Sequence, residues 1–170
     1  MPNKPPHEYK HYKNYPMDQW RWPDFSPREM RSKGDNRLMI DPNSMDKLQA
    51  LRDRVGPISI TSAYRSRAHN TAVGGAEASQ HMKARAFDCS MWNQTDPALF
   101  EAIARDVGFT DFGFYSDSNF IHIDDRGRGG EWGARWFKKW EGPLPAAKPT
   151  NLIGSLLAVI IGLFSKPKGN

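Results

Sequence analysis

Apolar residues recur at helical spacing in two segments of the chain, and turn-forming residues mark where each helix begins and ends. Residues 43–54 carry one apolar stripe, which the pair Gly56-Pro57 terminates. A second stripe follows the cap pair Asp96-Pro97 and ends at Gly108. The sequence Ser26-Pro27-Arg28-Glu29 has the pattern of a capping box, which predicts a further short helix. Three helices are therefore expected.

Other segments have the composition and alternation of β-strands. Residues 58–62 form one such segment, and residues 85–92 and 109–124 are rich in aromatic and β-branched side chains. Turn formers at 116–119 interrupt the last segment, which predicts a hairpin. Few strand–helix–strand alternations appear, so we predict an α+β domain in which helices pack on a small, mostly antiparallel sheet.

Changes in composition divide the chain into four segments. Residues 1–19 are punctuated by prolines, lysines and tyrosines and are expected to form an extended N-terminal arm. Residues 20–141 carry the patterns described above and form the predicted domain. Residues 142–150 have the proline content of a linker, and residues 151–170 form an apolar C-terminal tail.

The apolar part of that tail, Leu152 to Phe164, is 13 residues long. A bilayer-spanning helix needs about 20 residues, so we expect membrane association or marginal insertion through residues 151–164. A helix docked on the domain is the alternative. The first residues contain no apolar run of the secretory type. Synthesis in the cytoplasm without a signal peptide is therefore predicted.

The charge balance favours anionic partners without choosing among them. Lysine and arginine number 24 against 19 acidic residues, for a net charge of +5. Nucleic acid, anionic lipid and cell-wall material are all attracted by such a charge. Residues 126–140 contain a cluster of basic residues and tryptophans, which could bind nucleic acid by charge and stacking. We instead expect these tryptophans to pack on the domain, and we predict no nucleic-acid partner.

A small set of histidines and aspartates suggests a metal site. His81 and Asp88 are seven positions apart, and His122 lies in an alternating segment whose apolar residues are Ile121 and Ile123. Two imidazoles and one carboxylate are the ligands of catalytic zinc, which keeps a fourth position for water. Spacing alone leaves open the alternative that these are hydrogen-bonded histidines and a turn aspartate.

The order of several short elements resembles that of the zinc D-alanyl-D-alanine carboxypeptidase family. Ser79-x-His81-x-x-x-x-Ala86-x-Asp88 is similar to the family signature Ser-x-His-x-x-Gly-x-Ala-x-Asp. The segments Ser62-Ala63-Tyr64-Arg65-Ser66 and Phe120-Ile121-His122-Ile123-Asp124 resemble the elements upstream and downstream of it. The resemblance covers residues 20–137 and implies the hedgehog/D-Ala-D-Ala peptidase-like fold.

Carried over by position, the resemblance implies that His81, Asp88 and His122 bind zinc. It also implies that Arg65 clamps the substrate, and a guanidinium fork suits either a terminal D-Ala carboxylate or a developing oxyanion. Ser79, at the start of the signature, is expected beside the substrate.

The resemblance does not settle the general base, because Asn119 and Phe120 stand where many relatives carry a glutamate, aspartate or histidine. Asp124 and Asp117 are the two candidates. Asp124 could instead orient a ligand imidazole, and Asp117 could be an ordinary turn residue. Ala84 replaces the signature glycine, which matters only where the backbone needs a positive φ.

The implied activity is hydrolysis of peptidoglycan stem or cross-link peptides, as a carboxypeptidase or an endopeptidase acting at the cell wall. A wall substrate without an export signal fits a phage lysis enzyme, or endolysin. The alternative is a non-catalytic cell-wall-binding module of the same fold.

A second metal pattern occurs near the start of the chain. His7-Glu8-Tyr9-Lys10-His11 satisfies H-E-x-x-H, in which a buried helix presents two ligands and a glutamate base. Pro5-Pro6 and Pro16 flank the segment, and it lacks an apolar face. We therefore predict that this match arose by chance.

Overall fold

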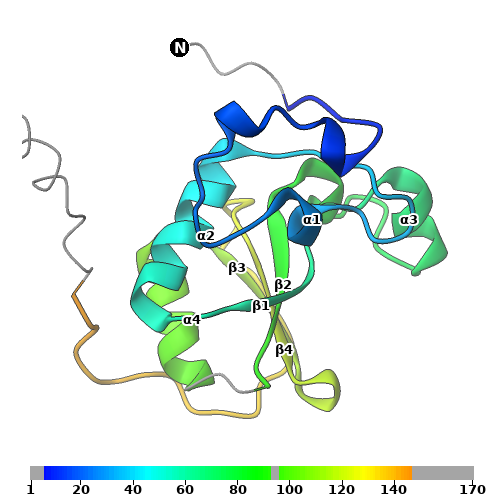
Figure 1. Ribbon diagram of the computed structural model, residues 1–170. Helices are drawn as coiled ribbons and strands as arrows, with labels where there is room; N and C mark the ends of the chain where they lie inside the picture. Colours follow the sequence, from blue (N-terminus) through cyan, green and yellow to red (C-terminus); the bar gives the residue numbers. More distant parts are fainter. Residues whose placement is uncertain (1–5, 93–95, 147–170) are drawn as a thin grey trace, which may run out of the picture.

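The computed structural model describes residues 6–92 and 96–146. A five-stranded sheet forms the centre of the molecule, with the strand order β1-β2-β4-β3-β5 (Figure 1). Every neighbouring pair is antiparallel except β3 and β5, which run parallel. The prediction of a mostly antiparallel sheet in an α+β domain is confirmed. The strands are β1 Ser59–Ser62, β2 Ala86–Ser90, β3 Asp111–Tyr115, β4 Phe120–Asp124 and β5 Glu131–Ala134.

Three of the four α-helices occupy the segments predicted for them. These are α1 Pro27–Met30, with its capping box, α2 Pro42–Val55 and α4 Pro97–Asp106. The fourth, α3 Arg67–Ala72, begins after the N-cap Ser66 and was not expected. Four 3₁₀ turns complete the described elements: η1 Tyr12–Asn14, η2 Met17–Gln19, η3 Gln80–Lys83 and η4 Ser116–Ser118.

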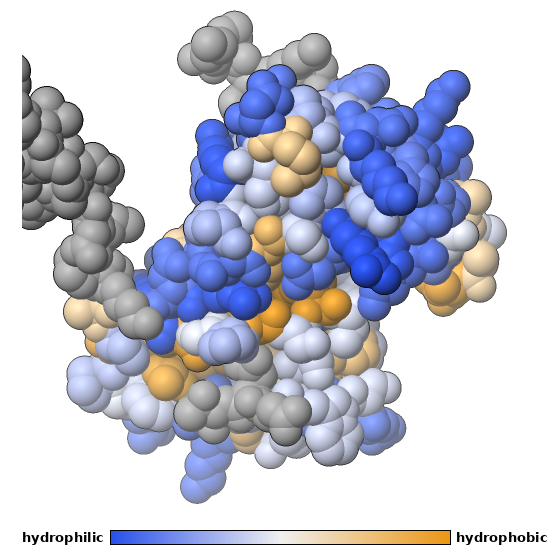
Figure 2. All heavy atoms as spheres, in the orientation of Figure 1, coloured by the Kyte–Doolittle hydropathy of each residue, from blue (hydrophilic) through white to orange (hydrophobic). Residues whose placement is uncertain are grey.

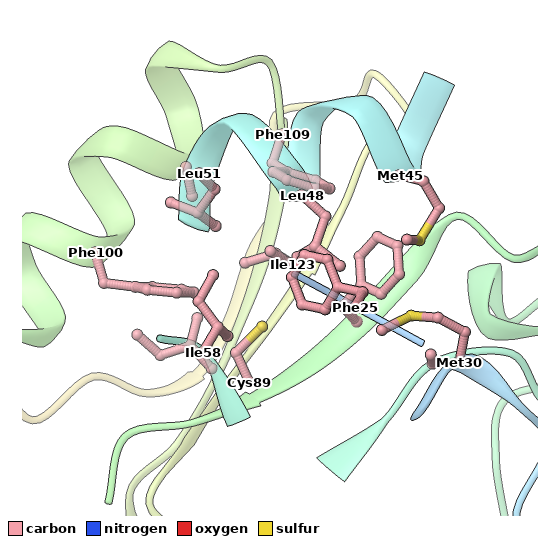
Figure 3. Close-up of a cluster of buried hydrophobic side chains, with 14 of the residues drawn as sticks. Phe25, Met30, Met45, Leu48, Leu51, Ile58, Cys89, Phe100, Phe109 and Ile123 are labelled. Atoms are coloured by element: carbon pink, nitrogen blue, oxygen red, sulfur yellow. The ribbon is translucent and has the colours of Figure 1, made fainter. Parts of the chain in front are cut away.

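The hydrophobic core lies between the sheet and the helices α2 and α4, which pack side by side (Figures 1 and 3). Strand β4 sends Ile121 and Ile123 into this core, and β2 contributes Phe87 and Cys89. Burial raises the pKa of the Cys89 thiol well above its ordinary value, so this side chain acts as a small apolar residue. Alternation along the strands then places their polar side chains on the opposite face.

The described part of the predicted N-terminal arm, residues 6–19, folds back on the domain rather than extending from it. Tyr9 exchanges backbone hydrogen bonds with Leu38, at 2.7 and 3.0 Å. The rings of Tyr9, Tyr15 and Trp20 then contact one another in sequence. Aromatic packing therefore fixes a segment whose composition alone predicted an extended chain.

The surface has the mixed character expected for a chain with 25% charged residues (Figure 2). Among residues 6–92 and 96–146, no helix is long and apolar enough to cross a membrane. Residues 147–170, which comprise the last four residues of the predicted linker and the whole apolar tail, lie outside the described residues. Residues 142–146 follow the domain, and the carbonyl of Pro145 accepts a hydrogen bond from Arg54 at 2.9 Å.

Candidate metal centre

The turn η3 positions His81. The Ser79 hydroxyl caps this turn by accepting a hydrogen bond from the His81 backbone N–H at 3.3 Å. The His81 ring donates from Nδ1 to the carbonyl of Ala63 at 2.6 Å, which leaves the Nε2 lone pair free to bind a metal. Burial lowers the pKa of His81, because the charged form is poorly solvated there. The imidazole is therefore held in the neutral form that a ligand requires.

Asp88 and His122 are direct partners across the antiparallel strands β2 and β4. His122 Nδ1 lies 2.8 Å from Asp88 Oδ1, and His81 Nε2 lies 3.2 Å from each of these two atoms. Among the described residues, these three side chains form the one group of histidine, cysteine and acidic residues that could hold a metal ion. We call them the ligand triad.

The donor spacing in the ligand triad suits a small tetrahedral ion. With bonds of about 2.0–2.1 Å to nitrogen and oxygen, two ligands of tetrahedral zinc lie about 3.3 Å apart. The separations of 2.8–3.2 Å are slightly shorter than this value, so the three donor atoms need to move apart only a little to bind zinc. All three residues are buried, but they also line an open cavity, which leaves a coordination position for water or substrate.

Asp124 lies behind His122, on the far side of the imidazole from the ligand triad. Its Oδ2 accepts the Nε2–H of His122 at 3.0 Å, and Arg126 donates to the same oxygen at 2.6 Å. Burial opposes ionisation, but the hydrogen bonds from His122 and Arg126 hold the pKa of Asp124 at about 2. The carboxylate is fully buried and does not line the cavity. This position fits the alternative role of Asp124, which is to orient His122.

Asp117, the other candidate base, belongs to the exposed turn η4. Its carboxylate accepts a hydrogen bond from the neighbouring Ser116 hydroxyl at 3.3 Å and does not line the cavity. This position fits the turn-residue alternative. Among the described residues, Asp88 is the one carboxylate in the lining of the cavity.

The cavity above the ligand triad has a volume of about 530 Å³. Arg65 lines it and is held in place by two contacts, from Nη2 to Asp88 Oδ2 at 2.6 Å and from Nε to the Ser62 hydroxyl at 2.8 Å. Ser79 lines it as well, so the structure brings both predicted substrate-binding residues to the ligand triad. The rest of the lining is a rim of mostly small residues, an aromatic wall and a second arginine: Val73, Gly74, Gly75, Ala76, Ala78, Tyr115, Phe120, Trp132 and Arg126.

The aromatic wall is a part of the site that sequence reasoning missed. The Trp132 ring packs on His122 with the ring centroids 5.3 Å apart, and its Nε1–H donates to the Tyr115 hydroxyl at 3.1 Å. Gly113 lies between His122 and Trp132 in the strand register. A Cβ atom at Gly113 would come within 2.6 Å of the indole nitrogen of Trp132. Glycine is thus required for the close approach of this ring.

The H-E-x-x-H match does not form a metal site. Residues 6–8 lie outside any helix, and Glu8 accepts hydrogen bonds from Tyr64 and Arg37. His11 accepts the backbone N–H of Lys13 at 3.2 Å as the N-cap of η1. Without a helix, the two histidines cannot share one helix face, so the segment lacks the geometry that the H-E-x-x-H pattern requires.

The fold and the ligand triad form a site that could hold one metal ion and leave a coordination position open to the cavity. A model of the Peptidase M15 family matches residues 23–124, which include every member of the ligand triad. The chain belongs to this family.

One relative is a zinc D-Ala-D-Ala carboxypeptidase from Streptomyces albus G. It is 38% identical over 85 residues, which make up 47% of this chain and 33% of the relative. The chain thus spans about a third of the length of that relative.

Proposed function

We propose that this protein is a zinc peptidase that hydrolyses peptide bonds in peptidoglycan. The observation that carries the proposal is the ligand triad, whose neutral His81 and converging donors lie at the base of an open cavity. Membership of a peptidase family and similarity to a zinc carboxypeptidase support the choice of metal and substrate.

Each residue of the site has a distinct task in this proposal. His81, Asp88 and His122 would hold the zinc ion, which when bound lowers the pKa of its water and polarises a carbonyl. Arg65 would bind the substrate, because a guanidinium fork suits a terminal carboxylate or a developing oxyanion. Since neither Asp117 nor Asp124 lines the cavity, we assign proton transfer to neither of them.

The zinc requirement and the bond that is cut can be tested together. Purified protein is incubated with peptidoglycan and with a synthetic stem peptide ending in D-Ala-D-Ala, with and without a chelator. Hydrolysis should stop on chelation and return on addition of zinc. Mass spectrometry then separates the two kinds of peptidase, because free D-Ala indicates a carboxypeptidase and new internal ends indicate an endopeptidase.

Two histidine variants provide the matched comparison. His81→Ala should lose both zinc and activity, since it removes one of three ligands. His11→Ala changes the same residue type in the H-E-x-x-H segment and should keep both. Loss of activity in His11→Ala with zinc still bound would overturn the proposal.

A second candidate function is that of a zinc-containing module that binds the wall without cleaving it. The observation in its favour is that Asp88 is the one carboxylate lining the cavity among the described residues. Sedimentation with insoluble peptidoglycan in the presence of zinc, without release of any peptide fragment, would identify this function.

A further inference from the structure

Two guanidinium groups reach the cavity from opposite sides of the ligand triad. Arg65 follows β1 at one edge of the sheet and contacts Asp88 on β2. Arg126 follows β4 and lies 5.3 Å from the ring of Trp132, which belongs to β5 at the other edge. A substrate that crosses the metal centre would therefore meet one arginine on each side.

Arg126 is held in a fixed orientation. Its Nε and Nη2 atoms donate to Asp124 at 2.6–3.0 Å, and the Trp132 ring faces the guanidinium. Within the described part of the chain, Nη1 has no hydrogen-bond partner, and the side chain is 26% exposed. A guanidinium that is anchored at one end and free at the other is preorganised to bind a carboxylate.

The charges around the cavity also favour an anionic substrate. Arg65 and Arg126 are balanced by Asp88 and Asp124, their ion-pair partners. A divalent ion at the ligand triad would then leave an excess positive charge at the base of the cavity. Asp88 and Asp124 already pair with their arginines and with histidines, so they cannot balance this additional positive charge. Carboxylates of the substrate can balance it.

We propose that Arg126 is a specificity-determining residue that binds a second carboxylate of the substrate, in addition to the group bound by Arg65. The inference rests on the proposed function for the identity of the substrate as a peptide. It narrows the substrate class to acidic peptides, in which an acidic residue carries a free carboxylate at the side of the metal centre away from Arg65.

Two synthetic stem peptides test this inference. They are identical except that one acidic residue carries either a free carboxylate or a carboxamide. Binding of each peptide to the zinc-loaded protein is measured by titration calorimetry. The wild-type protein should bind the acidic peptide at least tenfold more tightly than the amide. Arg126→Gln should reduce that preference to near unity, and Arg126→Lys should retain part of it, because lysine keeps the charge but not the fork.

Arg128→Gln is the matched control. Arg128 belongs to the same loop and is exposed, but it does not line the cavity, and its backbone N–H rather than its side chain contacts Asp111. This variant has the same change in net charge and should keep the wild-type preference.

The ratio of the two affinities separates substrate recognition from damage to the metal site. Loss of the contact between Arg126 and Asp124 would disturb His122 and weaken the binding of both peptides, without changing their ratio. The inference is overturned if the wild-type protein does not discriminate between the peptides, or if Arg126→Gln discriminates as well as the wild type. Discrimination without cleavage would support the inference and contradict the proposed peptidase activity.

Discussion

His122 donates its Nε2–H to Oδ2 of Asp124 at 3.0 Å, and its Nδ1 points to Asp88 at 2.8 Å. A neutral imidazole has one N–H group, so the bond to Asp124 determines which nitrogen keeps the lone pair for the metal. Arg126 in turn holds the carboxylate of Asp124. The orientation of this member of the ligand triad therefore depends on two residues outside the triad, Asp124 and Arg126.

Asp124→Asn should lower the affinity for zinc by about 10- to 100-fold, the usual effect of removing an outer-shell partner of a ligand. The amide is a weaker acceptor for His122 and cannot balance the charge of Arg126. Competition with a chromogenic chelator measures the affinity. At saturating zinc, much of the hydrolytic activity should return.

Asp117→Asn is the control for this prediction, and it should keep the wild-type affinity for zinc and the wild-type activity. The opposite pattern, in which Asp124→Asn binds zinc normally but stays inactive at saturating zinc, would restore Asp124 as the general base.

Local patterns predicted the side of the sheet that His122 faces, but the choice of His81, Asp88 and His122 as metal ligands also needed the family resemblance. The alternation in β4 places Ile121 and Ile123 in the core, so the intervening His122 must face the other side of the sheet. The same alternation places Asp124 on the face of His122. Alternation could not predict which ring nitrogen of His122 contacts Asp124, because that depends on the side-chain conformations of both residues.

The aromatic wall could not be predicted because it depends on contacts between distant segments. Strand β5 is short and pairs in parallel with β3, so no local hairpin pattern reveals it. The helix α3 was missed for a similar reason. It has six residues and no apolar stripe, since Asn70 is its one buried residue. Trp132 thus reaches the site through a tertiary pairing that leaves no periodic signal in the sequence.

The backbone at Ala84 has the left-handed conformation, with φ 56° and ψ 30°, at the end of the turn that carries His81. This is the position where Ala84 replaces the signature glycine, and the positive φ costs alanine roughly 1–2 kcal/mol. Ala84→Gly should relieve that strain. The gain is offset by loss of a buried methyl group and by the greater entropy of glycine in the unfolded chain.

The buried strand residue Ala86 separates these effects. Ala86→Gly also removes a buried methyl group and raises the entropy of the unfolded chain by the same amount. It relieves no strain, because the φ angle of Ala86 is not positive. Urea unfolding should show that Ala84→Gly is nearly neutral and that Ala86→Gly is less stable by about 1–2 kcal/mol. Equal destabilisation by the two substitutions would show that Ala84 is not strained.

Asp111 connects β3 to the loop that contains Arg126. Burial disfavours its charge, but hydrogen bonds from Thr110 and from the backbone N–H groups of Gly130 and Arg128 lower the pKa of its carboxyl. A carboxyl group whose pKa is lower in the folded state than in the unfolded state stabilises the fold at pH values above its unfolded-state pKa of about 3.9. That stabilisation is lost as the pH falls through the folded-state pKa.

Asp111→Asn should therefore be less stable than the wild type at pH 7, and the difference should shrink as the pH falls below about 4. Other carboxyl groups titrate in both proteins, so the comparison isolates Asp111. Urea unfolding at pH 7 and pH 3 measures the two differences. A constant difference at both pH values would show that ionisation of Asp111 does not contribute to stability.

Zinc should also stabilise the fold, because the ligand triad joins η3 to the strands β2 and β4. A ligand that binds only the folded state at 100 times its dissociation constant adds about 2.7 kcal/mol, which corresponds to an increase of several degrees in Tm. Chelation should lower the Tm by that amount, and zinc should restore it.

His81→Ala should unfold at the same temperature with and without zinc, whereas His69→Ala, at a histidine outside the ligand triad, should keep the response to zinc. A zinc response that survives in His81→Ala would place the metal elsewhere in the chain, and the change in Tm reports this independently of any substrate.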